Sequence, residues 1–273
     1  MLPALSQVCT LNSPFAQDLE DYAAGACRAV EIWLGKLETF LQDHTTDDVR
    51  RLLDQHGLVA PVASYQGGLL TSQGEQRKQH WDHFAQRLTL CQTLEIGTLV
   101  IAGDIGGPLD QNTFERIRVS LKQAAQQASE KNVRLAFEFR ANAPFANNLS
   151  TAAALIDDLG EPSLGICLDA FHFSIGPSKT EDLGCLTPAN LFHVQLSDVA
   201  GVPREWAKDS DRIMPGDGDF PLVQIIEHLR AINYQGCVSL ELMNPQIWQI
   251  SSRQFGEIAI TGLRKILGQA SMA

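Results

Sequence analysis

The stretch Leu164-Gly-Ile-Cys-Leu-Asp-Ala-Phe-His-Phe173 joins an apolar run to two ionisable residues. The run from Leu164 to Leu168 has the length and composition of a buried β-strand. It ends at Asp169, and His172 follows three residues later. A carboxylate at the end of a buried strand is costly unless it is paired or binds a cation. The stretch therefore predicts that a divalent metal ion compensates Asp169, and that other strand ends converge on the same ion.

The rest of the chain repeats this unit of a short apolar strand, a loop and a longer helix. Strands that are separated by helices pair in parallel, and eight such units in about 250 residues are typical of a (β/α)8 barrel. We therefore expect an α/β protein with one TIM-barrel domain over residues 1–273. A doubly wound open sheet is the alternative, but no Gly-x-Gly-x-x-Gly follows the first strand. The expected strands are 6–10, 29–34, 58–64, 98–102, 133–139, 164–168, 191–196 and 237–241.

Helix signals lie between these strands. Thr46 or Asp47 is the expected cap of one helix, and Gly57 is its expected end. Pro221 is the expected first residue of the helix before the last strand. The expected helices are 14–24, 46–56, 75–94, 112–131, 151–159, 221–231 and 253–267, with a short helix before the seventh strand.

Composition narrows the class of protein. The 273 residues are 44% hydrophobic, which is enough for a large core. The net charge of −11 argues against binding to nucleic acid or acidic membranes. With no 18-residue apolar run and no basic leader, we expect a cytoplasmic protein, and a homo-oligomer is compatible with the sequence. The six scattered cysteines lack any Cys-x-x-Cys pair and are expected to be buried free thiols.

Four polar residues end neighbouring strands of the expected barrel. They are Glu138, Asp169, Gln195 and Glu241, on strands five to eight. Chemistry in such barrels collects at the carboxyl ends of the strands. Three carboxylates there would repel one another unless a divalent cation binds, and oxygen-rich ligation suits Mn²⁺ or Mg²⁺. The simpler interpretation is that each acid is salt-bridged or partly solvated at its strand end.

Two histidines lie close to this set. His172 lies beyond its strand in a loop, where it either moves a proton, hydrogen-bonds the substrate, or merely caps the loop. His193 precedes Gln195 by two residues, so both point to one face of the strand. His193 is therefore an alternative ligand, a neighbour of the ligands, or a substrate-binding residue.

Three further residues are candidates for the barrel mouth or interior. Arg212 lies just before Pro215-Gly-Asp-Gly-Asp219, and is either a substrate-binding cation over the mouth or a solvated loop residue. Glu31 and Trp33 alternate along strand two, so both are expected to face the interior. We expect Glu31 to bind substrate and Trp33 to pack in the core. Asp198 is either a turn residue or part of the site.

This ordered set of residues resembles the xylose isomerase-like TIM-barrel superfamily, which includes sugar phosphate isomerases, ketose 3-epimerases, inosose dehydratase, 3-dehydroshikimate dehydratase and endonuclease IV. The resemblance runs from Ala29-Val-Glu-Ile-Trp33 to Val238-Ser-Leu-Glu-Leu242. It implies a metal held by Glu, Asp, His and Glu at the ends of strands five to eight. Gln195, in Gln195-Leu-Ser-Asp198, stands at the usual histidine. An amide oxygen favours Mn²⁺ or Mg²⁺, with Co²⁺ or Zn²⁺ as alternatives, and disfavours the multi-zinc endonuclease reading.

The resemblance also implies proton abstraction next to a carbonyl, with an enediolate that the metal stabilises. Similarity to the epimerases implies that Glu138 and Glu241 act as base and acid, and similarity to the dehydratases implies that His172 moves the proton. The first hypothesis is a metal-dependent isomerase or epimerase of a small sugar or polyol ketone. The alternatives are a dehydratase of a cyclic polyhydroxy ketone, such as 3-dehydroshikimate or an inosose, and a non-catalytic sugar-binding protein. The loop Ser64-Tyr-Gln-Gly-Gly68 lacks the basic residue that suits a carboxylate substrate in the dehydratases.

Overall fold

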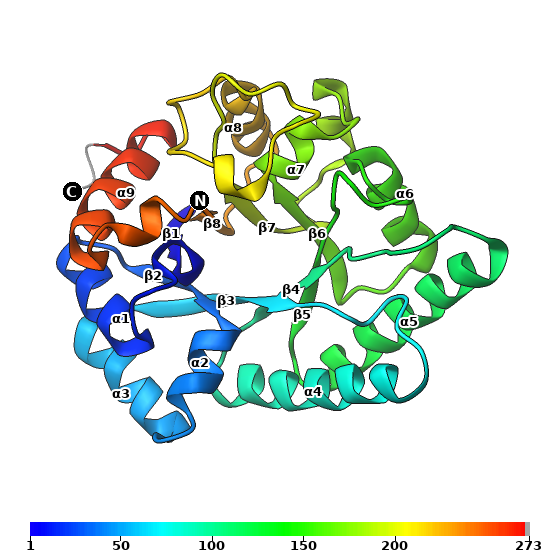
Figure 1. Cartoon of the computed structure of the whole chain (residues 1–273), viewed down its shortest axis with the longest axis horizontal. Helices are drawn as coiled ribbons and strands as arrows, with labels where there is room; N and C mark the ends of the chain where they lie inside the picture. Colours follow the sequence, from blue (N-terminus) through cyan, green and yellow to red (C-terminus); the bar gives the residue numbers. More distant parts are fainter. Residues whose placement is uncertain (271–273) are drawn as a thin grey trace.

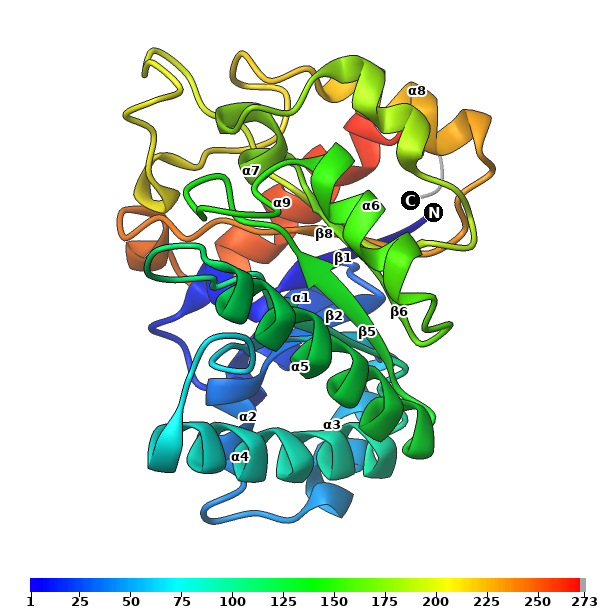
Figure 2. The ribbon, with the colours of Figure 1, turned by 90° about the vertical axis from the view of Figure 1, so that its right-hand side faces the viewer.

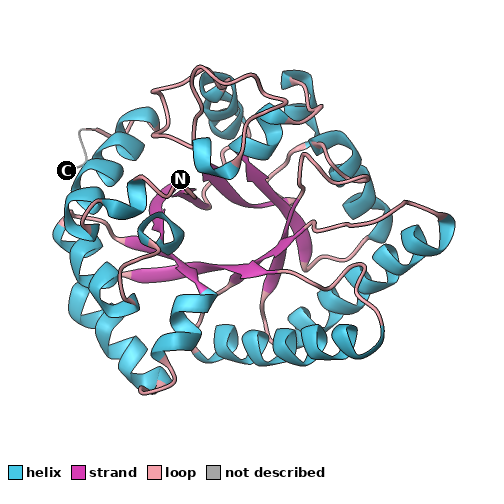
Figure 3. Cartoon of the chain, in the orientation of Figure 1, coloured by secondary structure: helices cyan, strands magenta, loops and turns pink. Residues whose placement is uncertain are grey.

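The computed structural model describes residues 1–270, and it confirms the (β/α)8 barrel. Eight parallel strands close in sequence order, with β1 paired to β8 (Figures 1 and 3). The strands are β1 (Leu2–Ser6), β2 (Ala29–Trp33), β3 (Val59–Gln66), β4 (Thr98–Ala102), β5 (Arg134–Glu138), β6 (Leu164–Asp169), β7 (Leu191–Leu196) and β8 (Cys237–Leu240).

Helices surround the barrel, and the side view shows them running along its outer face (Figure 2). In the part of the chain that the structure describes, no helix is both long and apolar enough to cross a membrane. The helices are α1 (Phe15–Ala24), α2 (Leu34–Phe40), α3 (Thr46–His56), α4 (Gly74–Thr93), α5 (Gln111–Glu130), α6 (Leu149–Leu159), α7 (Ala170–Ile175), α8 (Leu222–Ala231) and α9 (Ser252–Ile266). Short 3-10 helices within the described residues are η1 (Gln7–Thr10), η2 (Thr180–Cys185), η3 (Asp209–Asp211) and η4 (Ile247–Gln249).

The core has two parts. The larger part packs the helices against the outer face of the strands. The smaller part takes one side chain from each strand, and most of these are small, so the interior of the barrel is filled rather than open. This interior cluster consists of Ala4, Ala29, Val62, Val100, Ala136, Cys167, Phe192 and Cys237.

The predicted first strand was placed too late in the chain. The structure has β1 at Leu2–Ser6, and the residues after Ser6 form the buried turn η1. Apolar residues lie on both sides of Ser6, so their pattern did not mark where the strand ends. Pairing with β8 sets the position of β1, because Leu2 to Leu5 align with Cys237 to Leu240. Helix α2 was also missed, since it begins directly at the end of β2.

The helix ends of the structure lie within about one residue of the predicted caps. Thr45, one residue before the predicted cap, forms a capping box with Asp48, and Gly57 ends α3 with a φ of 62°. Pro221 is the cap of α8 rather than its first residue. His172 lies on the short helix α7, not in a loop as predicted. All six cysteines are free, as predicted; five of them are buried, whereas Cys185 is half-buried.

Gly165 in β6 is the position where a single methyl group should disturb the barrel most clearly. A Cβ there would lie 2.6 Å from the Asn190 carbonyl oxygen and 2.7 Å from the Phe192 ring. We expect Gly165→Ala to lower the free energy of unfolding by about 1–3 kcal/mol, because neither backbone nor ring can retreat easily. Gly97→Ala is the matched control, since nothing lies within 4 Å of its added Cβ. Equal unfolding midpoints in urea for the two variants would contradict this account.

Candidate active site

A small cavity opens at the carboxyl ends of the strands, where the site was expected. Its volume is about 200 Å³. This is smaller than the roughly 300–1,000 Å³ of pockets that take drug-sized ligands, so it suits one small molecule. Its lining is Trp33, Ser64, Tyr65, Gln66, Gly67, Val100, Ala102, Asp104, Glu138, Arg140, Gln195, Arg212, Glu241 and Met243.

Arg212 is the cation at the centre of the site. Its guanidinium lies 2.7 Å from Asp169 Oδ2, 3.1 Å from Glu241 Oε2 and 2.8 Å from Asp209 Oδ1. It also lies over the Phe171 ring, 4.3 Å from its centroid. Burial alone would lower the pKa of Arg212, but the three carboxylates outweigh it and raise that pKa. Because only 1% of its side chain is exposed, Arg212 is not a solvated loop residue.

The loop before α8 delivers this arginine, and Asp198 organises the loop. The Asp198 carboxylate accepts hydrogen bonds from the backbone N–H groups of Val199, Gly216 and Phe220, at 2.9 to 3.0 Å. Asp198 also forms a backbone bridge to Ile213, next to Arg212. Of the two interpretations of Asp198, the turn residue is therefore the one that its contacts support.

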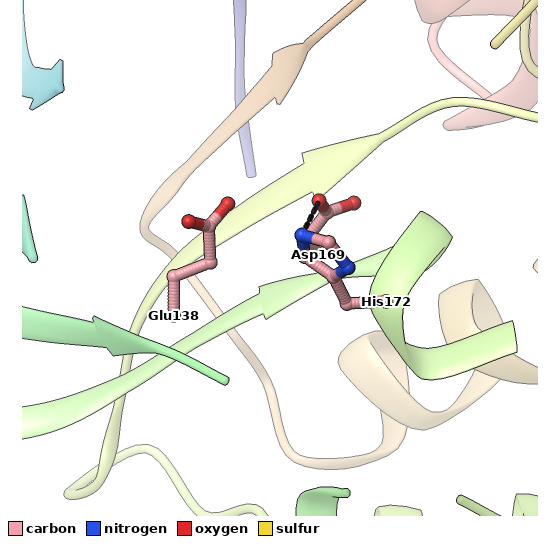
Figure 4. Close-up of side chains that lie close together, drawn as sticks. All are labelled: Glu138, Asp169 and His172. Atoms are coloured by element: carbon pink, nitrogen blue, oxygen red, sulfur yellow. Dashed lines mark ion pairs between the residues drawn. The ribbon is translucent and has the colours of Figure 1, made fainter. Parts of the chain in front are cut away.

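Glu138, Asp169 and His172 form a compact cluster of potential metal ligands. One ligand atom from each lies within 4.8 Å of the others (Figure 4). His172 Nε2 lies 3.8 Å from Asp169 Oδ2, and within the described residues neither ring nitrogen of His172 has a hydrogen-bond partner. Two carboxylates and one neutral imidazole are ligands that divalent metals accept. The residues present therefore fit a divalent metal ion.

Burial tunes the protonation of this cluster. Removal of water raises the pKa of Glu138 to about 7, although the nearby Arg140 acts in the opposite direction. Burial also raises the pKa of Glu241 well above its usual range, against the effect of Arg212. For His172, burial lowers the pKa to about 4, so its imidazole is neutral at pH 7 with a lone pair available.

Gln195 does not point its amide oxygen at this cluster. Its Nε2 donates to Glu31 Oε1 and to Glu241 Oε1, both at 3.0 Å. Its Oε1 accepts from the Cys167 thiol at 3.1 Å. The amide N–H groups thus hold two carboxylates that would otherwise repel each other. The structure brings His172, rather than Gln195, to Glu138 and Asp169, and metal ligation by Gln195 stays a prediction.

Glu31 and His193 lie beneath the cavity rather than in its lining. Both are fully buried, and His193 Nε2 lies 2.8 Å from Glu31 Oε2 and 3.2 Å from Ser239 Oγ. Burial raises the pKa of Glu31, but the contact with His193 outweighs it, and the net shift is downward. The predicted interior orientation of Glu31 is as the structure has it. The structure does not bring either residue to the space where a substrate fits, so their contacts suggest that they support Gln195 instead.

Arg140, Asp104 and Tyr65 are among the lining residues that were not singled out from the sequence. Arg140 follows Glu138 by two residues on the same face, so strand alternation was a signal that could have found it. Asp104 lies in the glycine-rich loop after β4. Tyr65, near the end of β3, had no such signal, because the strand is irregular there.

Comparison with known proteins agrees with the fold. A model of the xylose isomerase-like TIM barrel family matches residues 20–262. The inosose isomerase of Halalkalibacterium halodurans is 26% identical over 255 residues, which cover 91% of this chain and 90% of that protein. The 3-dehydroshikimate dehydratase of Pseudomonas aeruginosa is 25% identical over 266 residues, which cover 94% of this chain and 40% of the longer relative.

Solved structures show the same fold. The crystal structure of the IOLI protein with a binding zinc atom superposes with a TM-score of 0.90 at 22% identity, and covers 99% of both chains. D-psicose 3-epimerase in the presence of D-fructose gives a TM-score of 0.78 at 18% identity, and covers 98% of this chain and 100% of its own. Because the family match spans most of the described barrel, the chain belongs to the xylose isomerase-like TIM barrel family.

Proposed function

We propose that this enzyme isomerises a small polyhydroxy ketone by moving a proton from the hydroxyl-bearing carbon beside the carbonyl to the carbonyl carbon. The observation that carries this proposal is the pair of carboxyl groups, Glu138 and Glu241, that line one small cavity from β5 and from the end of β8. Burial raises the pKa of both groups, to about 7 for Glu138, so Glu138 can take up or release a proton near neutral pH. The similarity to inosose isomerases supports the same reaction type.

The donor set supports a divalent metal cofactor, with Mn²⁺ or Mg²⁺ expected from its oxygen-rich ligands. Glu138, Asp169 and His172 would hold the ion, with Glu241 and Gln195 as the other predicted ligands. When bound, such an ion polarises a carbonyl oxygen and stabilises the negative charge that develops there.

The chain's own residues supply the proton transfer. Glu138 is the better base, because in the described part of the chain its carboxylate makes no hydrogen bond or ion pair, whereas Glu241 is held by Arg212 and Gln195. The base takes a proton from the carbon beside the carbonyl, and the electron pair moves onto the carbonyl oxygen to give an enediolate. A proton then passes from the neighbouring hydroxyl oxygen to the former carbonyl oxygen. Return of the first proton to the former carbonyl carbon completes the isomerisation, with the carbonyl and hydroxyl groups exchanged. The small cavity limits water around this step.

Exchange of substrate hydrogen in D₂O tests this proposal. The Mn²⁺-loaded wild-type protein is incubated with 2-keto-myo-inositol or D-psicose, and NMR follows deuterium at the carbon beside the carbonyl. We expect exchange, with formation of an isomeric ketone, on at least one of the two. The absence of exchange with both substrates would contradict the proposal.

A second candidate is dehydration of a cyclic polyhydroxy ketone. The observation that favours it is His172, whose neutral ring lies beside Asp169 and has no hydrogen-bond partner at either nitrogen within residues 1–270. The similarity to 3-dehydroshikimate dehydratases supports it as well. Dehydration creates a conjugated chromophore, so new ultraviolet absorbance during the same incubation separates it from isomerisation.

A further inference from the structure

Strand β3 is irregular where it reaches the cavity. Its register against β4 shifts between Ala63 and Gln66, and Tyr65 within this segment has a φ of 84°. A bulge of this kind re-aims a side chain and is common next to active sites. A positive φ in a bulky non-glycine residue is strained, and it persists only where the surroundings impose it. Contacts around Tyr65 must therefore hold its backbone in this conformation.

A half-buried ion pair between two helices holds this conformation. Arg87 of α4 donates to the Tyr65 carbonyl oxygen at 2.5 Å and to Gln66 Oε1 at 3.3 Å. The same guanidinium donates to both oxygens of Glu38 on α2, at 2.6 and 2.8 Å. A bidentate arginine–carboxylate pair has a fixed geometry. Arg87 thus holds the backbone of Tyr65 in place against its strain.

The consequence is an aromatic ring presented at the cavity. The Tyr65 ring stacks on Trp33 with centroids 4.3 Å apart, yet 58% of Tyr65 stays exposed. Both rings line the cavity that also contains Glu138 and Glu241. An open aromatic face is the kind of surface against which the apolar C–H face of a small ring packs. An open-chain polyol offers no such face.

A carboxylate beside the same loop complements this ring. Asp104 Oδ2 accepts from the Gly68 N–H at 2.6 Å, which holds the side chain against the end of the β3 loop. Asp104 Oδ1 is buried and, within residues 1–270, has no hydrogen-bond partner. A buried acceptor without a partner is costly, and a substrate hydroxyl would satisfy it. The aromatic face and this acceptor together form a surface for a hydroxylated ring.

We propose that Tyr65 is a specificity-determining residue whose ring selects a cyclic polyol over an open-chain one. In this arrangement Asp104 accepts a hydrogen bond from one hydroxyl group of the cyclic polyol. This rests on the proposed function, and it narrows the substrate to a cyclic polyhydroxy ketone. Arg87 and Glu38 are positioning residues, because neither lines the cavity. Arg87 bonds the Tyr65 carbonyl oxygen and Gln66 and lies 5.8 Å from the Tyr65 ring centroid, and Glu38 holds Arg87.

Two polyols that differ mainly in ring closure test this inference by binding alone. Isothermal titration of the Mn²⁺-loaded protein compares myo-inositol with sorbitol, and neither contains a carbonyl group to react. We expect wild type to bind myo-inositol about tenfold more tightly than sorbitol. Tyr65→Gly should lose this preference and Tyr65→Phe should keep it. Arg87→Gln should weaken the preference although the ring is still present.

Thermal unfolding separates recognition from a structural role. Tyr65→Gly relieves the positive φ, so its Tm should not fall although the ring contacts are lost. Glu95→Gly is the matched control, because Glu95 is exposed and also has a positive φ of 57°, but it does not line the cavity. It should relieve the same kind of strain and leave polyol binding unchanged.

The inference is overturned if wild type binds the two polyols equally, if it binds neither, or if Tyr65→Gly keeps the wild-type preference. A failure of the proposed isomerisation would appear elsewhere, as absence of deuterium exchange from the ketones. The two failures can therefore be told apart.

Discussion

Replacing Arg212 with glutamine is expected to lower the free energy of unfolding of the metal-free protein by about 3–5 kcal/mol. The guanidinium is buried between Asp169 and Glu241, and the substitution leaves these two carboxylates without their cation. Removing one partner of a buried pair costs far more than the pair contributes net, because the remaining charge has lost its water. Urea denaturation after chelation measures the effect.

Arg204 provides the control for this experiment. It pairs with Glu205 at the surface, and its side chain is 60% exposed. Surface pairs contribute about 0–1 kcal/mol, so Arg204→Gln should be nearly neutral. Added Mn²⁺ should raise the Tm of Arg212→Gln more than that of wild type, since the ion supplies the missing positive charge. Equal stability of the two variants would mean that the carboxylates at Asp169 and Glu241 do not depend on Arg212.

Glu138→Gln is expected to slow substrate hydrogen exchange by about 10²–10⁴-fold without lowering the Tm of the metal-free protein. The glutamine keeps the shape of the side chain but cannot accept a proton from carbon. Stability is preserved because water is largely removed around Glu138, which raises its pKa to about 7 and makes its charged form unfavourable. NMR measures the rate of hydrogen exchange, and thermal unfolding of the same samples measures the Tm.

The raised pKa of Glu138 sets the sign of the pH dependence of folding stability. The folded protein binds the Glu138 proton more tightly than the unfolded chain, so the stability that this group contributes is present at low pH. It is lost as the pH rises from the usual glutamate range to about 7, and it stays constant above that. The Tm advantage of Glu138→Gln should grow over this interval. Glu130→Gln, at the exposed end of α5, should show no such trend.

The sequence predicted the barrel and the strand-end acids for one physical reason. Buried parallel strands are short apolar runs, and a polar residue at the end of such a run is conspicuous, as at Glu138 and Asp169. The same alternation indicated that Glu31 faces inward. It could not indicate depth along the barrel axis, so it did not reveal that Glu31 lies beneath the cavity, paired with His193.

Other features depend on tertiary contacts that no local pattern encodes. The position of Arg212 is set by a long loop that Asp198 ties together across the chain. The orientation of the Gln195 amide depends on two carboxylates from β2 and from the end of β8. Tyr65 lies in a bulge, which breaks the period of two on which strand prediction rests.

The pairing of β1 with β8 has a consequence for how the chain is made. The first strand leaves the ribosome long before its partner exists, at roughly 5–20 residues per second, so it waits on the order of ten seconds or more with one edge open. Glu241 follows β8 directly and reaches the cavity only when that strand closes the ring. Until β8 pairs with β1, a nascent chain therefore has neither a complete site nor a covered first strand.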